Sequence, residues 1–202
     1  MDDEYRTIEK PAEGIYREKG SRFLAFGYPV ANEDSAKEFL NGLRKKYHDA
    51  RHHCYAYKLL EGNLYRYNDD GEPSGTAGKP IFGTIISNDL NNILVVVVRY
   101  FGGTLLGRNR LLNAYRSAAL DMISNAGIIE CHIENIYRFE FPYIKMSEVM
   151  NLIKEESLPV IHPEYNESCS FYTIIRKSNA GNILGRIEAV AGLKWSAMKE
   201  IT

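Results

Sequence analysis

The chain has 202 residues, a length that fits one large domain or two small ones. Hydrophobic residues make up 45% and charged residues 25%, which excludes disordered and collagen-like classes. The formal net charge of −1 excludes a polyanion-binding field over the whole molecule. Cys54, Cys131 and Cys169 lie far apart without a CxxC spacing, which predicts reduced thiols in a cytoplasmic protein. No apolar run reaches the ~18–20 residues of a membrane span, and the acidic N-terminus lacks a signal-peptide pattern.

The first two thirds of the chain predict a mixed α/β domain. Strand patterns cover residues 14–19 and 23–29, and a helix is expected over 33–47 with Asn32 as its N-cap. A hairpin over 54–67 and a short helix over 79–87 follow. The continuous β-branched run 93–98 predicts a strand that is buried on both faces. A long helix over 110–125 and a strand over 128–136 complete this part.

The last third predicts a small second domain. Strands are expected at 137–143, 168–175 and 193–201, with extended segments around Pro159 and Pro163. Helical spacing of apolar residues follows the first of these strands, and a second helix is expected from Asn179 to a C-terminal cap at Gly192. The resulting βαββαβ order is that of a ferredoxin-like domain. We therefore predict an α+β protein with domains at 1–134 and 135–202.

The segment 68–80 is a candidate binding loop. It holds three glycines, two prolines and three acids in thirteen residues, too many for a simple hairpin turn. Ser74, Thr76 and Lys79 stand just before a helix, where backbone N–H groups can cradle an anion. The alternative is a rigid turn packed on the sheet, braced by its acids.

The segment 99–110 is the second candidate loop, since ligands often bind beyond the carboxyl end of a buried strand. Its arginines, Arg99, Arg108 and Arg110, can grip phosphate oxygens, and Gly102 and Gly103 allow close backbone approach. Stacking of its aromatic residues, Tyr100 and Phe101, on bases is the alternative to core packing, which we expect.

A search for catalytic groups finds little. His52 and Cys54 share one face of a strand, but no Asn or Asp is placed to orient the histidine. A buried structural cysteine is the simpler expectation. The acids of the first loop fit neither an EF-hand nor a two-metal site. The sequence therefore predicts no catalytic residue, metal ligand or cofactor, and an enzymatic activity is not the expectation.

Three segments together resemble a known signature. Residues 70–81, 93–107 and 50–56, in which His52 and Cys54 hold the family positions, resemble the YigZ/IMPACT family, as does the pair Ala114 and Tyr115. The resemblance covers essentially the whole chain. It implies an N-terminal domain like the second domain of ribosomal protein S5 and a C-terminal ferredoxin-like domain similar to the last domain of elongation factor G. One departure is that Asn109 and Arg110 stand where family members usually carry a glycine pair.

The resemblance also bears on function. Both implied folds recur in ribosomal and translation-factor proteins, so RNA or the ribosome is the implied partner. Eukaryotic relatives regulate translation through the amino-acid-starvation kinase pathway, but their RWD domain precedes the shared domain, and only about a dozen residues precede the first expected strand here. Regulation through the amino-acid-starvation kinase pathway is therefore not expected of this chain.

The predicted function is a non-enzymatic cytoplasmic protein that contacts RNA or the ribosome and regulates translation. Two basic stretches, 44–58 and 90–120, support it if the fold brings them together. The expected binding residues are Arg99, Gly102, Gly103, Arg108, Arg110, Ser74, Thr76, Lys79 and His52. The alternative is an enzyme or small-ligand protein with one phosphate site between the loops 70–79 and 99–110, which requires Arg99 and Lys79 in one pocket. A third possibility, a protein partner docked on the C-terminal sheet, requires an exposed apolar patch there.

For Arg99 itself, we expect a structural brace rather than a phosphate ligand. A desolvated arginine without a partner costs several kcal/mol, and the available partners are a carboxylate of Asp69, Asp70 or Glu72, or an external phosphate.

Overall fold

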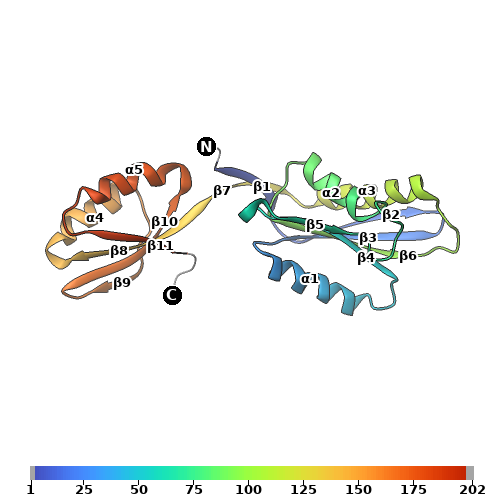
Figure 1. The fold of residues 1–202 in the computed structure, drawn as a ribbon, viewed down its shortest axis with the longest axis horizontal. Coiled ribbons are helices and arrows are strands. Elements are labelled where there is room, and N and C mark those ends of the chain that lie inside the picture. Colours follow the sequence, from blue (N-terminus) through green and yellow to red (C-terminus); the bar gives the residue numbers. More distant parts are fainter. Residues whose placement is uncertain (1–2, 199–202) are drawn as a thin grey trace. The chain divides into compact units, whose positions relative to one another are not determined.

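The computed structural model describes residues 3–198 and divides into two compact units, each containing both helices and strands (Figure 1). Unit 2 comprises residues 5–131, and unit 1 comprises Asp3, Glu4 and residues 132–198. The early residues join unit 1 because the Ile133 N–H donates to the Asp3 carbonyl (2.7 Å) and Arg176 binds the Asp3 carboxylate. No helix within the described residues has both the length and the apolarity needed to cross a bilayer.

A five-stranded sheet forms the middle of unit 2. Its order is β2 (Ala12–Glu18), β3 (Ser21–Pro29), β6 (Ile93–Tyr100), β4 (His52–Lys58) and β5 (Tyr65–Asn68), and each pair of neighbours is antiparallel. Residues 93–98 of the central strand β6 are 0% exposed, which confirms the burial predicted from their continuous apolar run. The hairpin of β4 and β5, joined through a short 3₁₀ turn (Glu61–Asn63), is also confirmed.

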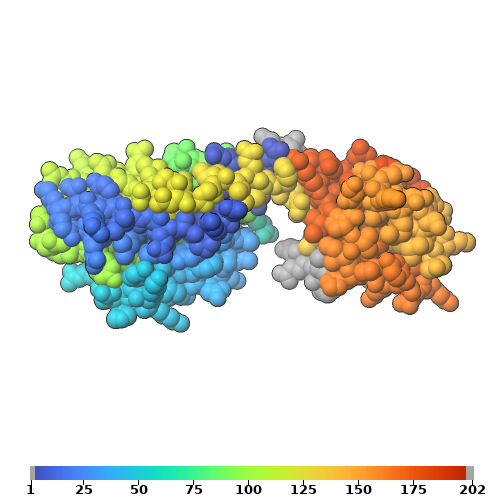
Figure 2. Space-filling view, turned by 180° about the vertical axis from the view of Figure 1, so that it is seen from behind, coloured from blue at the N-terminus to red at the C-terminus, as the bar shows by residue number. Residues whose placement is uncertain are grey.

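Helices cover both faces of this sheet (Figure 1). The helix α1 (Glu33–Lys46) packs on one face, and its N-terminus is capped by Asn32 as expected. The helices α2 (Gly78–Ser87) and α3 (Arg108–Asn125) pack on the other face. Figure 2 shows β2 in blue beside α3 in yellow-green. Gly14 permits this approach, since a Cβ there would lie 2.3 Å from the Met122 backbone nitrogen.

One predicted strand is divided in the structure. The expected strand 128–136 is two strands, β7 (Ile128–His132) and β8 (Glu134–Pro142), which belong to different sheets. β7 pairs with β1 (Glu4–Ile8), a strand that the sequence did not predict. The division occurs at Ile133, whose N–H is held by the Asp3 carbonyl rather than by a neighbouring ladder. A long-range pairing of this kind leaves no local pattern in the sequence.

Unit 1 has the predicted βαββαβ order. After β8 come a 3₁₀ turn (Tyr143–Lys145), α4 (Met146–Glu155), β9 (Ile161–Tyr165), β10 (Ser168–Arg176), α5 (Lys177–Glu188) and β11 (Lys194–Met198). The antiparallel sheet has the order β11-β8-β10-β9, and its core is aromatic, with Phe139 and Phe141 in edge-to-face contact with Phe171. The helix α5 begins two residues before its predicted start. The predicted continuation of the last strand to residue 201 lies outside the described residues.

The face of this sheet away from the core is polar at its centre and apolar at one end, where Ile136, Ile174 and Met198 are cross-strand neighbours and partly buried. Its central positions hold Arg138, Glu140 and Tyr172, with Lys194 and Ser196 opposite them on β11. The most exposed apolar side chains of the described part of unit 1, Tyr143 and Ile144, lie in the 3₁₀ turn instead. Docking of a protein partner on this sheet therefore stays a prediction.

Candidate functional site

The two predicted loops meet at one edge of the sheet in unit 2. Arg99, near the end of β6, donates from Nη1 to Glu72 Oε1 at 2.6 Å, and the two side chains are only 8% and 4% exposed. Arg108, the first residue of α3, donates from Nη2 to the Ser74 carbonyl at 2.9 Å. This ion pair confirms the expected brace between Arg99 and an acid of the first loop. The expectation rested on the need of a deeply buried guanidinium for a counter-charge.

Glu72 is the centre of a buried polar cluster. Its carboxylate also accepts the Tyr115 hydroxyl at 2.8 Å, and His52 Nε2 lies 4.0 Å away. His52 Nδ1 lies 2.8 Å from the Asp70 carbonyl oxygen and therefore donates to it, so that Nε2 is the nitrogen left to face Glu72. These bonds connect the loop to β4, β6 and α3.

Cys54 is structural, as the sequence predicted. Its thiol lies 2.9 Å from the Asp69 carbonyl oxygen and 3.3 Å from the Tyr115 hydroxyl, and it is 0% exposed. Burial raises the pKa of the Cys54 thiol far above its usual value, and burial likewise raises the pKa of Tyr115. A thiol held neutral in this way is not a nucleophile at physiological pH, so His52 and Cys54 do not form a catalytic pair.

The predicted anion cradle before α2 is filled by the chain itself. Asp69 accepts the backbone N–H groups of Gly75 (2.8 Å), Ala77 (2.9 Å) and Gly78 (2.8 Å). The carboxylate therefore provides the negative charge that a helix N-terminus favours. This corrects the expectation of an external anion at this position. Three of the N–H groups that would bind the anion are already paired.

Asp70 completes the brace. Its carboxylate accepts the His53 backbone N–H at 2.7 Å and lies 3.1 Å from Arg44 Nη2. All three acids of the first loop therefore hold the loop to the rest of unit 2, as the structural alternative in the sequence analysis expected.

Two neighbouring cavities flank the braced loop. The first, called here the Arg99 cavity, has a volume of about 520 Å³ and is lined by residues that include Arg51, His52, Glu72, Arg99, Phe101 and Arg108. The second, the Lys79 cavity, has about 530 Å³ and is lined by residues that include Gly75, Lys79, Arg108, Leu112 and Arg116. Arg108 lines both cavities. The phosphate-site alternative required Arg99 and Lys79 in one pocket. The two residues line different cavities, so the structure does not meet this requirement.

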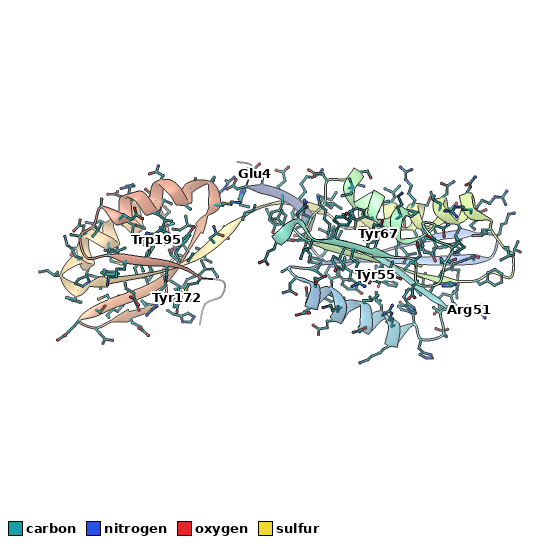
Figure 3. All side chains as sticks on the ribbon, viewed as in Figure 1. Glu4, Arg51, Tyr55, Tyr67, Tyr172 and Trp195 are labelled. Carbon is teal, nitrogen blue, oxygen red and sulfur yellow. The ribbon has the colours of Figure 1, made fainter. Side chains whose placement is uncertain are left out.

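The cavities concentrate positive charge. Their linings contain five Lys or Arg side chains, namely Arg51, Lys79, Arg99, Arg108 and Arg116, and one acid, Glu72, which Arg99 neutralises. The whole chain, in contrast, has 25 basic and 26 acidic residues. Arg51, labelled in Figure 3, comes from the first basic stretch and the others from the second or from α2. The fold thus brings part of the two stretches together, while Arg44, Lys45 and Lys46 lie on α1.

The other predicted binding residues have different surroundings. Thr76 is 0% exposed and its hydroxyl donates to the Pro73 carbonyl (2.6 Å), which removes it from the candidate site. Gly102 packs against the Gly20 backbone, and its N–H donates to Ser21 Oγ at 3.1 Å, so its role is close packing. Gly103, Arg110 and Ser74 are exposed but line neither cavity.

Sequence reasoning missed three members of the site. Arg51 and Arg116 were not singled out, although each lies in a basic stretch, which was the available signal. Phe101 was expected in the core and is 53% exposed. Residues 93–98 of β6 are a continuous apolar run without alternation and the strand ends at Tyr100, so no periodicity was available to place the Phe101 side chain.

A second polar cluster lies in unit 1. The possible metal-ligand atoms of Asp3, Glu4 and His132 lie within 4.8 Å of one another. However, Arg176 binds both acids, with Nε 2.8 Å from Asp3 and Nη2 2.9 Å from Glu4, and these bonds hold the pKa of Asp3 well below its usual range. The guanidinium already pairs with both carboxylates, so the arrangement is a brace.

Comparisons with known proteins agree with the resemblance. The family model described as the Impact N-terminal domain matches residues 19–123, just over half of the chain. "IMPACT family member YvyE" of Bacillus subtilis is 30% identical over 174 residues, covering 86% of this chain and 80% of that protein. "IMPACT family member YigZ" of Escherichia coli is 40% identical over 100 residues, covering 48% and 49%. The crystal structure of a hypothetical protein covers 100% of both chains with a TM-score of 0.73 and 24% identity, which shows a common fold.

Proposed function

The chain belongs to the IMPACT family, and we propose that it regulates translation by contacting RNA through the surface formed by the Arg99 and Lys79 cavities. The observation that carries this proposal is the charge of that surface, where five Lys or Arg side chains accompany a single, neutralised acid in a chain of net charge −1. Clustered arginine and lysine side chains are what binding to a phosphate backbone requires.

The architecture adds support by analogy. The βαββαβ order of unit 1, with its last strand beside its first, fits the proposed ferredoxin-like domain similar to the last domain of elongation factor G. We infer for unit 2 the S5-like domain that the family resemblance implies. Both analogies are to proteins of the ribosome or of translation, so we propose that this protein acts at the ribosome. Its proposed location is therefore the cytoplasm.

A non-enzymatic role fits the buried groups of the site. Burial keeps the Cys54 thiol neutral. The Glu72 carboxylate accepts hydrogen bonds from Arg99 and Tyr115, and the Asp69 carboxylate accepts hydrogen bonds from three backbone N–H groups. The alternative, an enzyme or small-ligand protein with a single phosphate site, has less support because Arg99 and Lys79 line different cavities.

Filter binding of a structured RNA at about 50 and 200 mM salt tests the proposal, because neutralised phosphates make affinity fall with salt. Lys79→Ala is expected to weaken binding and to reduce the slope of log K against log salt by about 0.7–0.9. Lys45→Ala is the matched control, since Lys45 is an exposed lysine on α1, at the opposite face of the sheet. An affinity indifferent to salt, or equal effects of the two substitutions, would overturn the proposal.

A further inference from the structure

The Arg99 cavity has an aromatic wall that is open to solvent. The Arg99 guanidinium carbon lies 5.4 Å from the ring centroid of Phe23 and 5.7 Å from that of Phe101. Phe23 is fully buried, whereas Phe101 is 53% exposed and forms the outer member of this stack. Leu105, Leu106 and Leu111 extend the apolar lining. A further flat, aromatic ring is the group that such a wall accommodates best.

The same cavity has a cationic end at the N-terminus of α3. The N-cap is Gly107, no side chain of residues 3–198 caps the helix, and no acid lies in its first turn. This distinguishes α3 from α2, where Asp69 already accepts the N–H groups. Arg108 is the first residue of this helix and Arg51 lines the same cavity, and neither forms an ion pair with a carboxylate within the described residues 3–198. Helix N–H groups together with arginines form a site for phosphate.

Arg99 supplies an independent sign of a ligand. Its side chain is 8% exposed, and its Nε is buried without a hydrogen-bond partner within the part of the chain that the structure describes. A buried donor of this kind costs stability unless an acceptor reaches it. Arg99 lines the cavity but its Nε is closed to solvent, so a polar atom of a bound molecule supplies that acceptor when the Arg99 side chain turns toward the cavity.

We propose that the Arg99 cavity binds one nucleotide, with its base against Phe101 and its phosphate between Arg51, Arg108 and the start of α3. The volume of about 520 Å³ lies within the range of small-molecule sites. The nucleotide comes either from an unpaired position of an RNA or from the free pool. Only the first source rests on the proposed function, and the second stands without it.

Fluorescence titration of the full chain with 2-aminopurine riboside monophosphate, and with an RNA hairpin that carries 2-aminopurine in its loop, tests both sources. Stacking on Phe101 is expected to change the probe's fluorescence, and Phe101→Leu is expected to raise the Kd at least about fivefold. Phe39→Leu is the matched control, because Phe39 stacks on Tyr28 at α1 and is 37% exposed. Arg51→Ala is expected to remove the preference for the monophosphate over its nucleoside.

The outcomes separate the two proposals. Binding of the free nucleotide that depends on Phe101, without RNA binding, supports the nucleotide site and overturns the RNA function. RNA binding that depends on Lys79 but responds to neither Phe101→Leu nor Arg51→Ala, with no free nucleotide bound, overturns the nucleotide site and leaves the RNA function standing. Binding of the hairpin alone, weakened by Phe101→Leu, supports both proposals with RNA as the source. Binding of neither probe overturns both.

Discussion

The Glu72 carboxylate balances the charge of the buried Arg99 guanidinium. Removing the charge of Glu72 should therefore lower the free energy of unfolding. Arg99 and Glu72 are 8% and 4% exposed, and within residues 3–198 Glu72 is the acid that Arg99 contacts, at 2.6 Å. Glu72→Gln keeps the size of the side chain and one acceptor oxygen. It removes the negative charge, so the guanidinium is left desolvated without a counter-charge.

The expected magnitude follows from this burial. Breaking a buried ion pair by removing one partner costs about 3–5 kcal/mol. Since a glutamine oxygen still accepts a hydrogen bond from Arg99 or Tyr115, we expect the lower end, about 3 kcal/mol. A change of 1 kcal/mol shifts the Tm of a domain the size of unit 2 by about 4 °C, so its Tm should fall by about 12 °C.

Urea unfolding of the full chain, followed by far-UV circular dichroism, measures this loss. Trp195, the single tryptophan of the chain, lies in unit 1, so its fluorescence reports that unit separately. Glu155→Gln is the matched control, because Glu155 is 61% exposed beside Arg186 and water screens that pair. Adding Arg99→Met to Glu72→Gln should recover part of the loss, since no buried charge then remains. A loss below about 1 kcal/mol, or no recovery in the double variant, would refute this reasoning.

Three further outcomes are expected from the same unit. In native protein at pH 8, iodoacetamide should modify the partly exposed Cys131 well before Cys54, because burial raises the pKa of the Cys54 thiol; equal rates by peptide mass mapping would contradict this. Burial lowers the pKa of His53, so the unfolded chain binds its proton more readily and stability should fall as the pH drops below about 6.5. His53→Gln should flatten this dependence in urea midpoints measured between pH 7 and 5, and an unchanged slope would count against it. Asp69→Asn should loosen the start of α2, because one amide oxygen cannot replace two carboxylate oxygens.

The sequence predicted those features whose cause is local. The burial of β6 follows from six consecutive apolar residues, and the start of α1 follows from the capping side chain of Asn32. The ion pair of Arg99 was also predictable, because the energetic cost of a lone buried charge leaves few arrangements for it. Each of these predictions required only residues close together in the chain or a single strong energetic constraint.

Features that depend on distant partners were not predictable in this way. β1 exists as a strand because it pairs with β7, more than 100 residues later. Asp69 accepts the backbone N–H groups at the start of α2 only because the loop folds back on itself. The spacing of residues along the sequence does not reveal this geometry. The two basic stretches predicted a basic surface, but Arg51 and Arg116 were assigned to it only once the sheet placed them beside Arg108.

Asp69 tests whether the first loop is a brace or a ligand site. Its Oδ1 accepts from Ala77 and Gly78, and its Oδ2 accepts from Gly75. In Asp69→Asn one of these oxygens becomes an NH₂ group, so at least one backbone N–H faces a donor, and the helix loses a negative charge at its positive end. The lost charged hydrogen bond and the lost charge–dipole attraction together amount to about 2–4 kcal/mol. Hydrogen exchange of the three amides should become faster, whereas Asp34→Asn, at a 93% exposed position in the first turn of α1, should leave them unchanged. If exchange at Gly75, Ala77 and Gly78 stays as slow as in the unaltered chain, Asp69 does not close this helix start, and an external anion again becomes the better explanation of the loop.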